Sequence, residues 1–578
     1  MLKILPALLV VLSLGLWNPP AFTQSATTTN NSAHGDWTGT LETPGGKMRL
    51  WLTVQEADDG SLSAVLESID QAPGQKIPTK NVTYSDNKLR FDIPAIGANY
   101  EGTWDANNKA WVGTFSQGIK LQLTFKQGAP KARAVITGVD GNWRTVLDRN
   151  GKKLRLVIKV KSSEQGTIVT FDALDAPAYD IPVANFTRTG NNISFAIPAA
   201  SARFEGMLNE NSTSFSGTWN RTGQPATQLT FSRDKDTAAA PQFKRPQNPT
   251  GTLPYLEEEV QIKNANQPDV VLAGTLTLPK GKGPFPAAIL ISGSGASDRN
   301  ESFMGHKPFL VLADHLTRNG IAVLRYDDRG TAQSTGNYST ANSEDFSHDA
   351  NAAFRYLTQR PEINTQAIGF IGHSEGGLIA PISLQTNKSA AFMVMLAGPG
   401  TNTRQLVISQ ARLTASAAGA SEAEMGPMLE ASKRVMTAVA ETPNLKQLKN
   451  KLDTVLDDAT LTALRIGPAH KAAAKAQFTS PWYRYFISYD PANYLPRISV
   501  PILAIGGSLD IQVPSAENLA GIKKLTTQNK DVTIHEFQGL NHLFQTAKTG
   551  TLGEYRDIEE TFAPQALEMV SSWINKRF

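Results

Sequence analysis

The sequence predicts a multidomain protein in which two small all-β domains, barrel- or sandwich-like, precede an α/β domain with a helical insertion. Three observations support this prediction. The first is an internal repeat of short alternating strands in the N-terminal part. The second is a succession of apolar strands and helix-like segments in the C-terminal part. The third is composition, because 578 residues with 40% hydrophobic and 19% charged side chains fit several folded domains.

The first segment of the chain, residues 1–25, is predicted to be a signal peptide. Lys3 supplies a positive charge, residues 4–17 are almost wholly apolar, and Pro19 and Pro20 end this run before small and polar residues. The expected location is therefore periplasmic or extracellular. After cleavage we expect no stable membrane span, because the apolar run is too short for one. An uncleaved anchor is the alternative.

Two copies of one pattern, residues 34–128 and 137–234, predict a duplicated β-domain. Trp37 in a Gly-x-Trp start is matched by Trp143, and both copies close on Leu-Thr-Phe. The period of about 105 residues is too long for a solenoid unit. Within each copy, strands of alternating polarity are separated by Gly, Asn and Asp turns, which favours a small antiparallel barrel or sandwich. The copies look similar to lipocalin-like barrels. Their aromatic residues either fill the cores or line a ligand surface.

Residues 235–254, rich in Ala, Pro, Lys and Asn, are the predicted linker to a C-terminal domain at residues 255–578. Here strands and helices alternate, which predicts a mostly parallel sheet with helices on both faces. The apolar strands are expected at residues 286–291, 321–324, 367–371, 392–396, 500–507 and 532–537. An amphipathic helix is expected at residues 343–360.

A helical insertion is predicted at about residues 403–487, where Ala, Lys, Glu and Leu predominate. An insertion at this position of the chain could cover a functional site, exclude water from it and shape its pocket. Its aromatic residues at 478–486 either face a substrate or pack in the core.

Residues 372–376 read Gly-His-Ser-Glu-Gly directly after the expected strand at 367–371. A serine between two glycines in such a strand-to-helix turn is typical of a nucleophile elbow. Glycine is required there because a side chain would collide with the neighbouring strand or helix. We therefore predict that Ser374 is a nucleophile.

An acid and a histidine follow Ser374 in the order that this fold requires. Asp510 lies in the turn after the strand at 500–507, and His542 lies in a loop after the strand at 532–537. A carboxylate that orients an imidazole, which in turn deprotonates a serine, forms a catalytic triad. His535 is the alternative base, but its place within the strand pattern favours a packed histidine.

Backbone N–H groups beside Ser374 are the predicted oxyanion hole. One belongs to Glu375, the residue after the nucleophile. The other is assigned to Ser294 in the glycine-rich loop after the strand at 286–291, with Gly295 as the alternative. His373 is predicted to be structural, and residues 327–329 (Asp-Asp-Arg) are predicted to form a loop with salt bridges.

Residues 255–578 resemble the α/β-hydrolase superfamily, in particular the bacterial esterase branch related to the serine aminopeptidase-type hydrolases. The matching segments occur in family order, at residues 291–299, 324–330, 372–377, 506–514 and 539–545. One departure is Ser292, which stands where many relatives carry histidine before glycine. The resemblance implies the α/β-hydrolase fold and a triad of Ser374, Asp510 and His542.

These features predict a carboxylesterase that cleaves short- to medium-chain acyl esters through an acyl-enzyme. Acylated carbohydrates are expected substrates if the β-domains bind carbohydrate. No cofactor or metal is expected, because the triad needs none and the eight histidines are scattered. The net charge of +4 makes no case for nucleic acid. One alternative is a serine exopeptidase, for which Glu375 and Asp298 are the candidate ligands of a free N-terminus. The other is a non-catalytic binding protein with a decayed hydrolase fold.

Overall fold

The computed structural model of the chain describes residues 33–43, 46–57, 59–69, 76–93, 98–117, 119–130, 134–149, 152–163, 166–174, 178–197, 200, 202–221, 225–234, 244–467 and 471–578. The predicted signal peptide, residues 1–25, lies outside the described residues. The chain divides into two compact units, and the boundary between them falls at Pro241 and Gln242. The first unit contains the two β-domains and the second contains the α/β domain.

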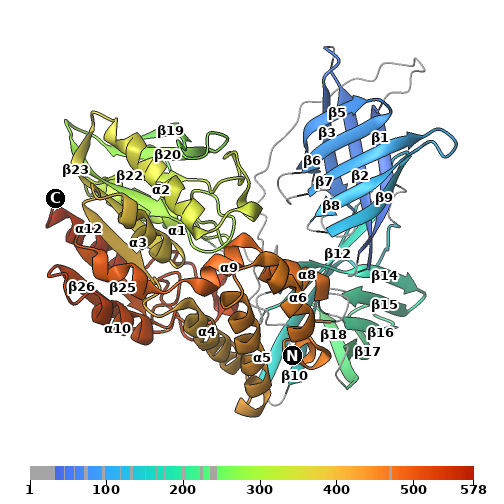
Figure 1. Ribbon diagram of the computed structural model, residues 1–578. Helices are drawn as coiled ribbons and strands as arrows, with labels where there is room; N and C mark the ends of the chain where they lie inside the picture. The colour runs from blue at the N-terminus through green and yellow to red at the C-terminus, as the bar shows by residue number, and fades with distance from the viewer. Residues whose placement is uncertain are drawn as a thin grey trace. The chain divides into compact units, whose positions relative to one another are not determined.

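The first β-domain is an antiparallel sheet of nine strands that curls until it is nearly closed (Figure 1). The strands lie in the order β4-β3-β2-β1-β9-β8-β7-β6-β5. At one end of this order β3, the neighbour of β4, approaches β5 at the other end, which nearly closes the sheet. The strands are β1 (Gly35–Thr43), β2 (Gly46–Glu56), β3 (Leu62–Ser68), β4 (Lys76–Pro78), β5 (Lys80–Ser85), β6 (Lys88–Ile93), β7 (Ala98–Asp105), β8 (Ala110–Gln117) and β9 (Ile119–Gln127). The inward side chains form one core that is rich in aromatic rings.

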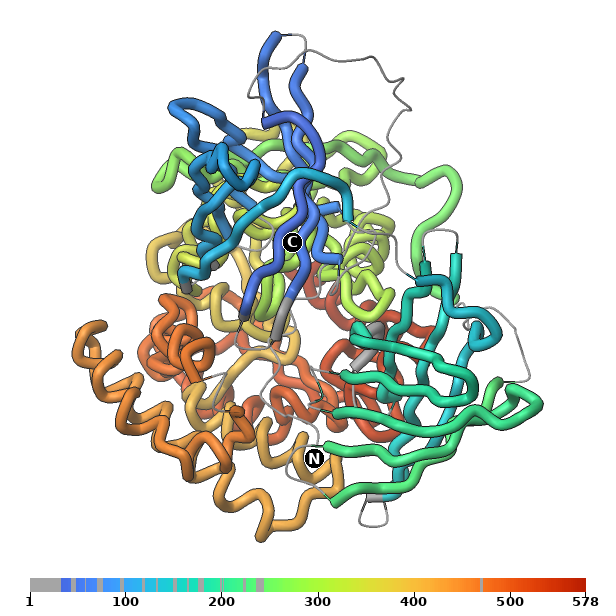
Figure 2. The backbone as a smooth tube through the Cα atoms, turned by 90° about the vertical axis from the view of Figure 1, so that its right-hand side faces the viewer, coloured from blue at the N-terminus to red at the C-terminus, as the bar shows by residue number. Residues whose placement is uncertain are grey.

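The second β-domain repeats this architecture with its own core (Figure 2, teal to green). Its strand order, β13-β12-β11-β10-β18-β17-β16-β15-β14, corresponds strand by strand to that of the first domain. The strands are β10 (Gly141–Arg149), β11 (Lys152–Ser163), β12 (Gly166–Ala173), β13 (Ala178–Pro182), β14 (Ala184–Thr189), β15 (Asn192–Ile197), β16 (Ala202–Leu208), β17 (Ser214–Arg221) and β18 (Thr227–Arg233). The prediction of two barrel-like all-β domains is confirmed.

The paired tryptophans show how closely the two copies correspond. Trp37 Nε1 donates to the Ala33 carbonyl at 2.8 Å, and Trp143 Nε1 donates to the Val139 carbonyl at the same distance. Both rings are buried in the core of their own domain. These two aromatic residues therefore fill the cores, which was one of the two roles expected from the sequence, and their polar N–H groups are satisfied.

The α/β domain is built on a sheet of eight strands in the order β19-β20-β22-β21-β23-β24-β25-β26. The pairs β19–β20 and β20–β22 are antiparallel, and all other neighbours are parallel. The strands are β19 (Tyr255–Lys263), β20 (Val271–Pro279), β21 (Phe285–Ile291), β22 (Ala322–Tyr326), β23 (Ile363–His373), β24 (Phe392–Leu396), β25 (Ile502–Gly507) and β26 (Val532–Phe537).

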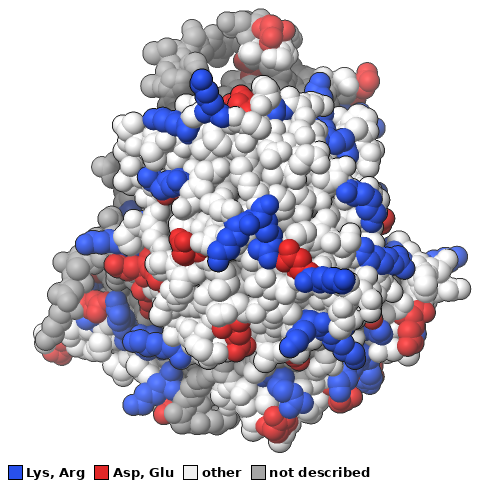
Figure 3. All heavy atoms as spheres, turned by 90° about the vertical axis from the view of Figure 1, so that its left-hand side faces the viewer, with Lys and Arg blue, Asp and Glu red and all other residues white. Residues whose placement is uncertain are grey.

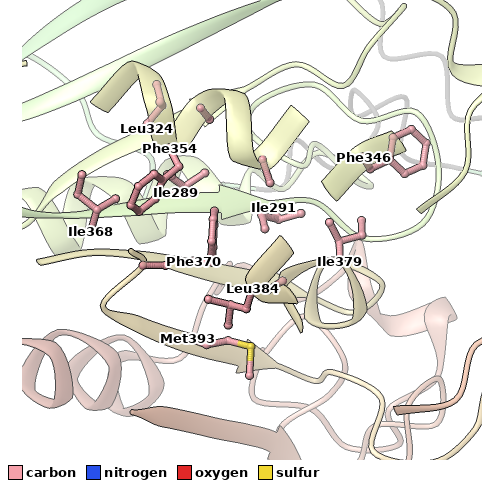
Figure 4. Close-up of a cluster of buried hydrophobic side chains, with 14 of the residues drawn as sticks. Ile289, Ile291, Leu324, Phe346, Phe354, Ile368, Phe370, Ile379, Leu384 and Met393 are labelled. Atoms are coloured by element: carbon pink, nitrogen blue, oxygen red, sulfur yellow. The ribbon is translucent and has the colours of Figure 1, made fainter. Parts of the chain in front are cut away.

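Helices cover both faces of this sheet because its central strands are apolar on both sides. In β21, Ile289 and Ile291 belong to one hydrophobic cluster, which includes residues of α2 (Ser343–Thr358), α3 (Gly376–Thr386) and α10 (Ser515–Leu525). Figure 4 shows part of this cluster. Ala288 and Leu290 belong to a second cluster with α1 (Pro308–Arg318) and α12 (Pro564–Asn575). The predicted α/β fold is confirmed.

Six helices follow β24 and occupy the region predicted to be an insertion. They are α4 (Thr403–Ala417), α5 (Glu422–Ala440), α6 (Leu445–Val455), α7 (Asp458–Ala463), α8 (Lys471–Phe478) and α9 (Pro481–Ser488). Polar side chains accept hydrogen bonds from the first turn of five of these helices, which accounts for where those helices begin. The capping residues are Asn402, Ser421, Asn444, Asp457 and Ser480.

The end of the predicted linker is attached to the α/β domain. The guanidinium of Arg245 donates to the carbonyls of Met304, Arg556 and Ile558 at 2.9–3.2 Å. The side chain of Gln247 bonds Phe562 in both directions, through its amide nitrogen and its carbonyl oxygen. This part of the segment therefore belongs structurally to the domain that follows it.

On the face drawn in Figure 3, basic and acidic side chains are interspersed. Within the described ranges, no helix is both long enough and apolar enough to cross a membrane.

Candidate active site

Ser374 occupies a sharp turn between β23 and α3. Its φ of 52° lies in the left-handed region, which a non-glycine residue adopts at a cost of about 1–3 kcal/mol. Two hydrogen bonds hold the turn. Ser374 N donates to the Leu396 carbonyl at the end of β24, and Gly377 N donates to the Ser374 carbonyl, both at 2.9 Å. This is the geometry of a nucleophile elbow.

The glycines around Ser374 are required by the closeness of neighbouring backbone. A Cβ atom on Gly372 would lie 2.0 Å from the Gly376 carbonyl oxygen, and one on Gly376 would lie 2.1 Å from the Ile291 carbonyl oxygen. Both distances are far below van der Waals contact. The elbow can therefore form only because these positions lack side chains.

Asp510 and His542, from the loops after β25 and β26, meet in the structure. Asp510 Oδ2 lies 2.7 Å from His542 Nδ1, and both side chains are buried. The other carboxylate oxygen, Oδ1, accepts the backbone N–H groups of Gln512 and Val513 at 2.8 Å. Since the carboxylate can only accept, the proton lies on His542 Nδ1, which leaves Nε2 as an acceptor.

His535, the alternative base, lies within β26 and is not the histidine paired with Asp510. Its ring packs edge-on against Phe537 with a centroid separation of 4.4 Å. His535 is accordingly a histidine of the strand.

The glycine-rich loop after β21 lies directly against Ser374, because a Cβ atom on Gly293 would be 3.1 Å from Ser374 Cβ. Gly293 N donates to Glu301 Oε1 at 2.7 Å, and Gly295 N donates to the Tyr338 hydroxyl at 3.0 Å. Between them, the N–H of Ser294 has no partner among the described residues. The loop thus offers Ser294, and not Gly295, as the available donor.

A second histidine–carboxylate pair lies beside the first. His373 Nδ1 is 2.8 Å from Glu301 Oε1, and His373 Nε2 is 2.9 Å from the carbonyl oxygen of His542. The rings of His373 and His542 are 4.8 Å apart. Because both partners of His373 are acceptors, both of its nitrogens must carry protons. Burial lowers the pKa of His373, but the charge and hydrogen bond of Glu301, the His542 carbonyl and the charge of Asp510 together outweigh burial, so the pKa is raised overall.

From the sequence, the backbone N–H of Glu375 was assigned to the oxyanion hole, and its carboxylate was a candidate ligand only in the exopeptidase alternative. Only 2% of Glu375 is exposed, and its carboxylate accepts hydrogen bonds from Ser294 Oγ, Ser343 Oγ and Trp482 Nε1. Burial raises the pKa of Glu375, and these hydrogen bonds oppose the increase. A carboxylate directly after the serine of the elbow was the signal for this network, but its partners are distant in the sequence.

Aromatic residues at 478–486 pack against hydrophobic clusters, which is one of the two roles that were expected for them. Phe478 belongs to the internal core of the helical insertion and packs on Tyr483 with a ring-centroid separation of 5.2 Å. Trp482 also reaches Glu375, beside the nucleophile, and stacks on Phe486 at 5.0 Å. Helix α9 therefore lies next to the elbow.

The charged turn at residues 327–329 forms salt bridges, as the sequence predicted. Asp327 accepts two hydrogen bonds from the guanidinium of Arg299, at 2.8 and 3.0 Å. Arg329 pairs with Asp349 of α2 at 2.6 Å.

In the part of the chain that the structure describes, no three His, Asp or Glu residues are arranged to hold a metal ion.

The strand order and the elbow together decide the fold family. Counted along the chain, the eight strands lie in the order 1-2-4-3-5-6-7-8, and Ser374 follows the fifth of them. The acid and the histidine follow the seventh and eighth strands. A serine at such an elbow, followed along the chain by an acid and then a histidine, characterises one superfamily. The C-terminal region has the α/β-hydrolase fold.

Residues 307–546 of this α/β-hydrolase domain match the family described as serine aminopeptidase, S33. Esterase EstD of Thermotoga maritima is 28% identical over 300 residues, which are 51% of this chain and 64% of EstD. The match thus spans less than two thirds of that relative. Among solved structures, the Pyrococcus furiosus esterase Pf2001 is similar with a TM-score of 0.34 and 17% identity, over 58% of this chain and 97% of that chain. The hydrolase GrgF from Penicillium sp. sh18 has a TM-score of 0.33 and 17% identity, over 50% and 91%.

Proposed function

We propose that the protein is a serine hydrolase of carboxylic esters and that Ser374, His542 and Asp510 form its catalytic triad. The observation that carries this proposal is the buried pair of Asp510 and His542, 2.7 Å apart. The ring centroid of His542 lies 4.8 Å from that of His373, the residue before the serine of the elbow. The sequence similarity to an esterase supports the same reaction class.

In the proposed mechanism, Ser374 Oγ attacks the acyl carbonyl while His542 Nε2 takes the hydroxyl proton. Asp510 holds the proton on Nδ1 and stabilises the imidazolium that forms. The alkoxide leaves with the proton from His542, and an acyl-enzyme remains on Ser374. A water molecule, deprotonated by His542, then releases the acid.

The oxyanion of each tetrahedral intermediate is assigned to the backbone N–H groups of Ser294 and Glu375. Among the described residues, neither N–H has a hydrogen-bond partner within the protein. One donor of this kind is typically worth about 3 kcal/mol of the barrier.

The alternative, an exopeptidase, requires an acidic group free to bind a substrate ammonium. Asp298 accepts hydrogen bonds from Asn300 and Ser302 of its own loop. Glu375 already accepts from three side chains. Because both carboxylates are engaged, the site favours the esterase over the exopeptidase.

The substrate is proposed to be a small ester with a short- to medium-chain acyl group. If the β-domains bind carbohydrate, acylated carbohydrates become the natural substrates. The proposed location is periplasmic or extracellular and rests on the apolar N-terminal segment alone.

Hydrolysis of p-nitrophenyl esters from acetate to decanoate, measured beside aminoacyl p-nitroanilides, tests this proposal. We expect ester turnover that is absent in Ser374→Ala and that ranks the acyl lengths. Turnover of anilides alone would replace the esterase with the peptidase. If the folded protein turned over neither, the proposed activity would be wrong for these substrates, and the binding role would become the better hypothesis.

A further inference from the structure

The carboxylate of Glu375 joins three separate elements beside the nucleophile. Ser294 Oγ, from the oxyanion loop, donates to Oε2 at 2.7 Å. Ser343 Oγ, at the start of α2, donates to Oε1 at 2.7 Å. Trp482 Nε1, from α9 of the helical insertion, lies 2.9 and 3.0 Å from the two oxygens. One buried charge therefore holds the loop, the insertion and α2 together.

Two of these partners bear directly on the reaction. Ser294 and Glu375 are also the residues whose backbone N–H groups are assigned to the oxyanion hole. The hydrogen bond between their side chains fixes the distance between the two donors, which must match the reacting oxygen closely. A buried carboxylate is costly without donors, so the loss of one partner changes how the others are held.

We propose that Glu375 is a positioning residue that couples helix α9 to the oxyanion hole, with Trp482 and Ser294 as the two ends of the coupling. The inference rests on the proposed function, because it concerns the same site. When α9 packs next to the elbow, Trp482 Nε1 donates to the carboxylate of Glu375. The carboxylate in turn accepts from Ser294 Oγ and holds this residue in place. The N–H group of Ser294 is then fixed before the substrate arrives.

A double-mutant cycle with Ser294→Ala and Trp482→Phe tests this coupling. Ser294→Ala removes the hydroxyl but keeps the backbone N–H, and Trp482→Phe keeps an aromatic ring but removes the donor. Each single change should lower kcat by about 10-fold, the value of one hydrogen bond to a charged group, with KM within about twofold. Because both act through one carboxylate, the double variant should lose about 10- to 20-fold, far less than the roughly 100-fold of independent effects.

Trp573→Phe is the matched control. Trp573 Nε1 donates to Thr533 Oγ1 at 3.0 Å in the same domain, so this variant also loses one indole hydrogen bond. It should leave kcat unchanged. A merely structural loss at Trp482 would resemble the control, with a lower melting temperature but an unaltered kcat.

The reaction of Ser374 with a fluorophosphonate gives a second readout that needs no ester substrate. In this reaction the Ser374 Oγ–P bond forms, the P–F bond breaks, fluoride leaves and His542 takes the serine proton. The phosphonyl oxygen uses the same oxyanion hole, so the cycle should show the same non-additivity in the labelling rate. If esters are not hydrolysed but labelling is coupled in this way, the proposed function fails and the positioning role stands. Additive effects, effects on KM alone, or a wild-type protein that is not labelled would each overturn the positioning role.

Discussion

At the scale of single residues, the site depends on a strained serine and two histidine–carboxylate pairs. The φ of 52° at Ser374 is maintained by the hydrogen bond from its N–H to the Leu396 carbonyl. The glycines on either side of Ser374 allow neighbouring backbone to approach closely. The pair of His542 and Asp510 supplies the proposed base. His373, which is paired with Glu301, helps to position this base, since His373 Nε2 donates to the carbonyl of His542. The geometry of the proposed site is thus fixed in part by groups that have no part in the proposed reaction.

Asp510→Asn is expected to lower kcat by about 10³- to 10⁴-fold with little change in KM. The amide cannot hold the proton on His542 Nδ1 and stabilise an imidazolium. Steady-state kinetics with a p-nitrophenyl ester measures the effect. Asp531→Asn, which breaks the partly exposed ion pair with Arg577, is the control and should change kcat by less than about twofold. Equal effects of the two substitutions would remove Asp510 from the mechanism.

The pair of His373 and Glu301 is expected to make stability fall as the pH rises. The pKa of His373 is raised in the folded protein, so its contribution is complete below the unfolded value near 6.5 and is lost as the pH rises through the folded value. Glu301→Gln removes the charge that raises this pKa while burial, which lowers it, remains. The folded pKa should then lie below 6.5, and the contribution of His373 to stability should increase with pH.

Thermal unfolding of the full chain between about pH 5.5 and 8.5 measures this reversal. The relevant transition is the one in which Ser374 loses its reaction with a fluorophosphonate. The matched control is Glu430→Gln, which changes an exposed pair with Lys433. Its pH dependence should follow that of the wild-type protein. The same slope in Glu301→Gln as in the wild-type protein would show that His373 is not charged in the folded state.

Much of the site was predictable from single residues, and the remainder has a physical reason. Ser374, Asp510 and His542 follow apolar strands in a fixed chain order, and that order is visible in the sequence. The choice between Ser294 and Gly295 was not, because it depends on Tyr338, which binds the N–H of Gly295 from a distant segment. Nor could the sequence reveal the carboxylate network of Glu375.

At the scale of elements, helix α2 links the core to the site. Its first turn carries a capping box formed by Asn342 and Asp345, and Ser343 bonds Glu375. The strands and this helix were predictable from their apolar patterns, which reflect burial on one or both faces. The arrangement of the helices in the insertion was not predictable. Those helices, α9 included, pack on one another by contacts between segments that are distant in the sequence.

Asn342→Ala is expected to cost about 1 kcal/mol of stability, the usual effect of losing a helix cap, and also to lower kcat. The second effect follows because the frayed turn contains Ser343. The control is Asn444→Ala at the start of α6, where the side chain also caps the helix by accepting the N–H of Gln447. It should cost similar stability without changing kcat. Urea unfolding and ester kinetics measure the two effects, and a loss of kcat in both variants would mean that stability alone explains it.

At the scale of the whole molecule, two kinds of domain have been joined in one chain. The repeat was visible in the sequence because the matched residues, such as Trp37 and Trp143, occupy matched places in two cores. The boundary of the α/β-hydrolase domain was less visible. Residues 244–254 have the composition of a linker, yet Arg245 and Gln247 satisfy backbone groups more than 300 positions away.

Truncation is expected to show where the catalytic unit begins. A chain of residues 242–578 retains every residue assigned to the site and the contacts of Arg245 and Gln247, so it should fold and keep the kcat of the full chain for p-nitrophenyl esters. A chain of residues 255–578 lacks those contacts and leaves carbonyl groups such as that of Arg556 without their donor. At about 1 kcal/mol for each lost hydrogen bond, it should melt at a distinctly lower temperature. Arg245→Ala in the longer chain should reproduce part of that loss. If residues 242–578 folded but lost activity, the β-domains would have to contribute to catalysis, and the site would not be confined to the α/β-hydrolase domain.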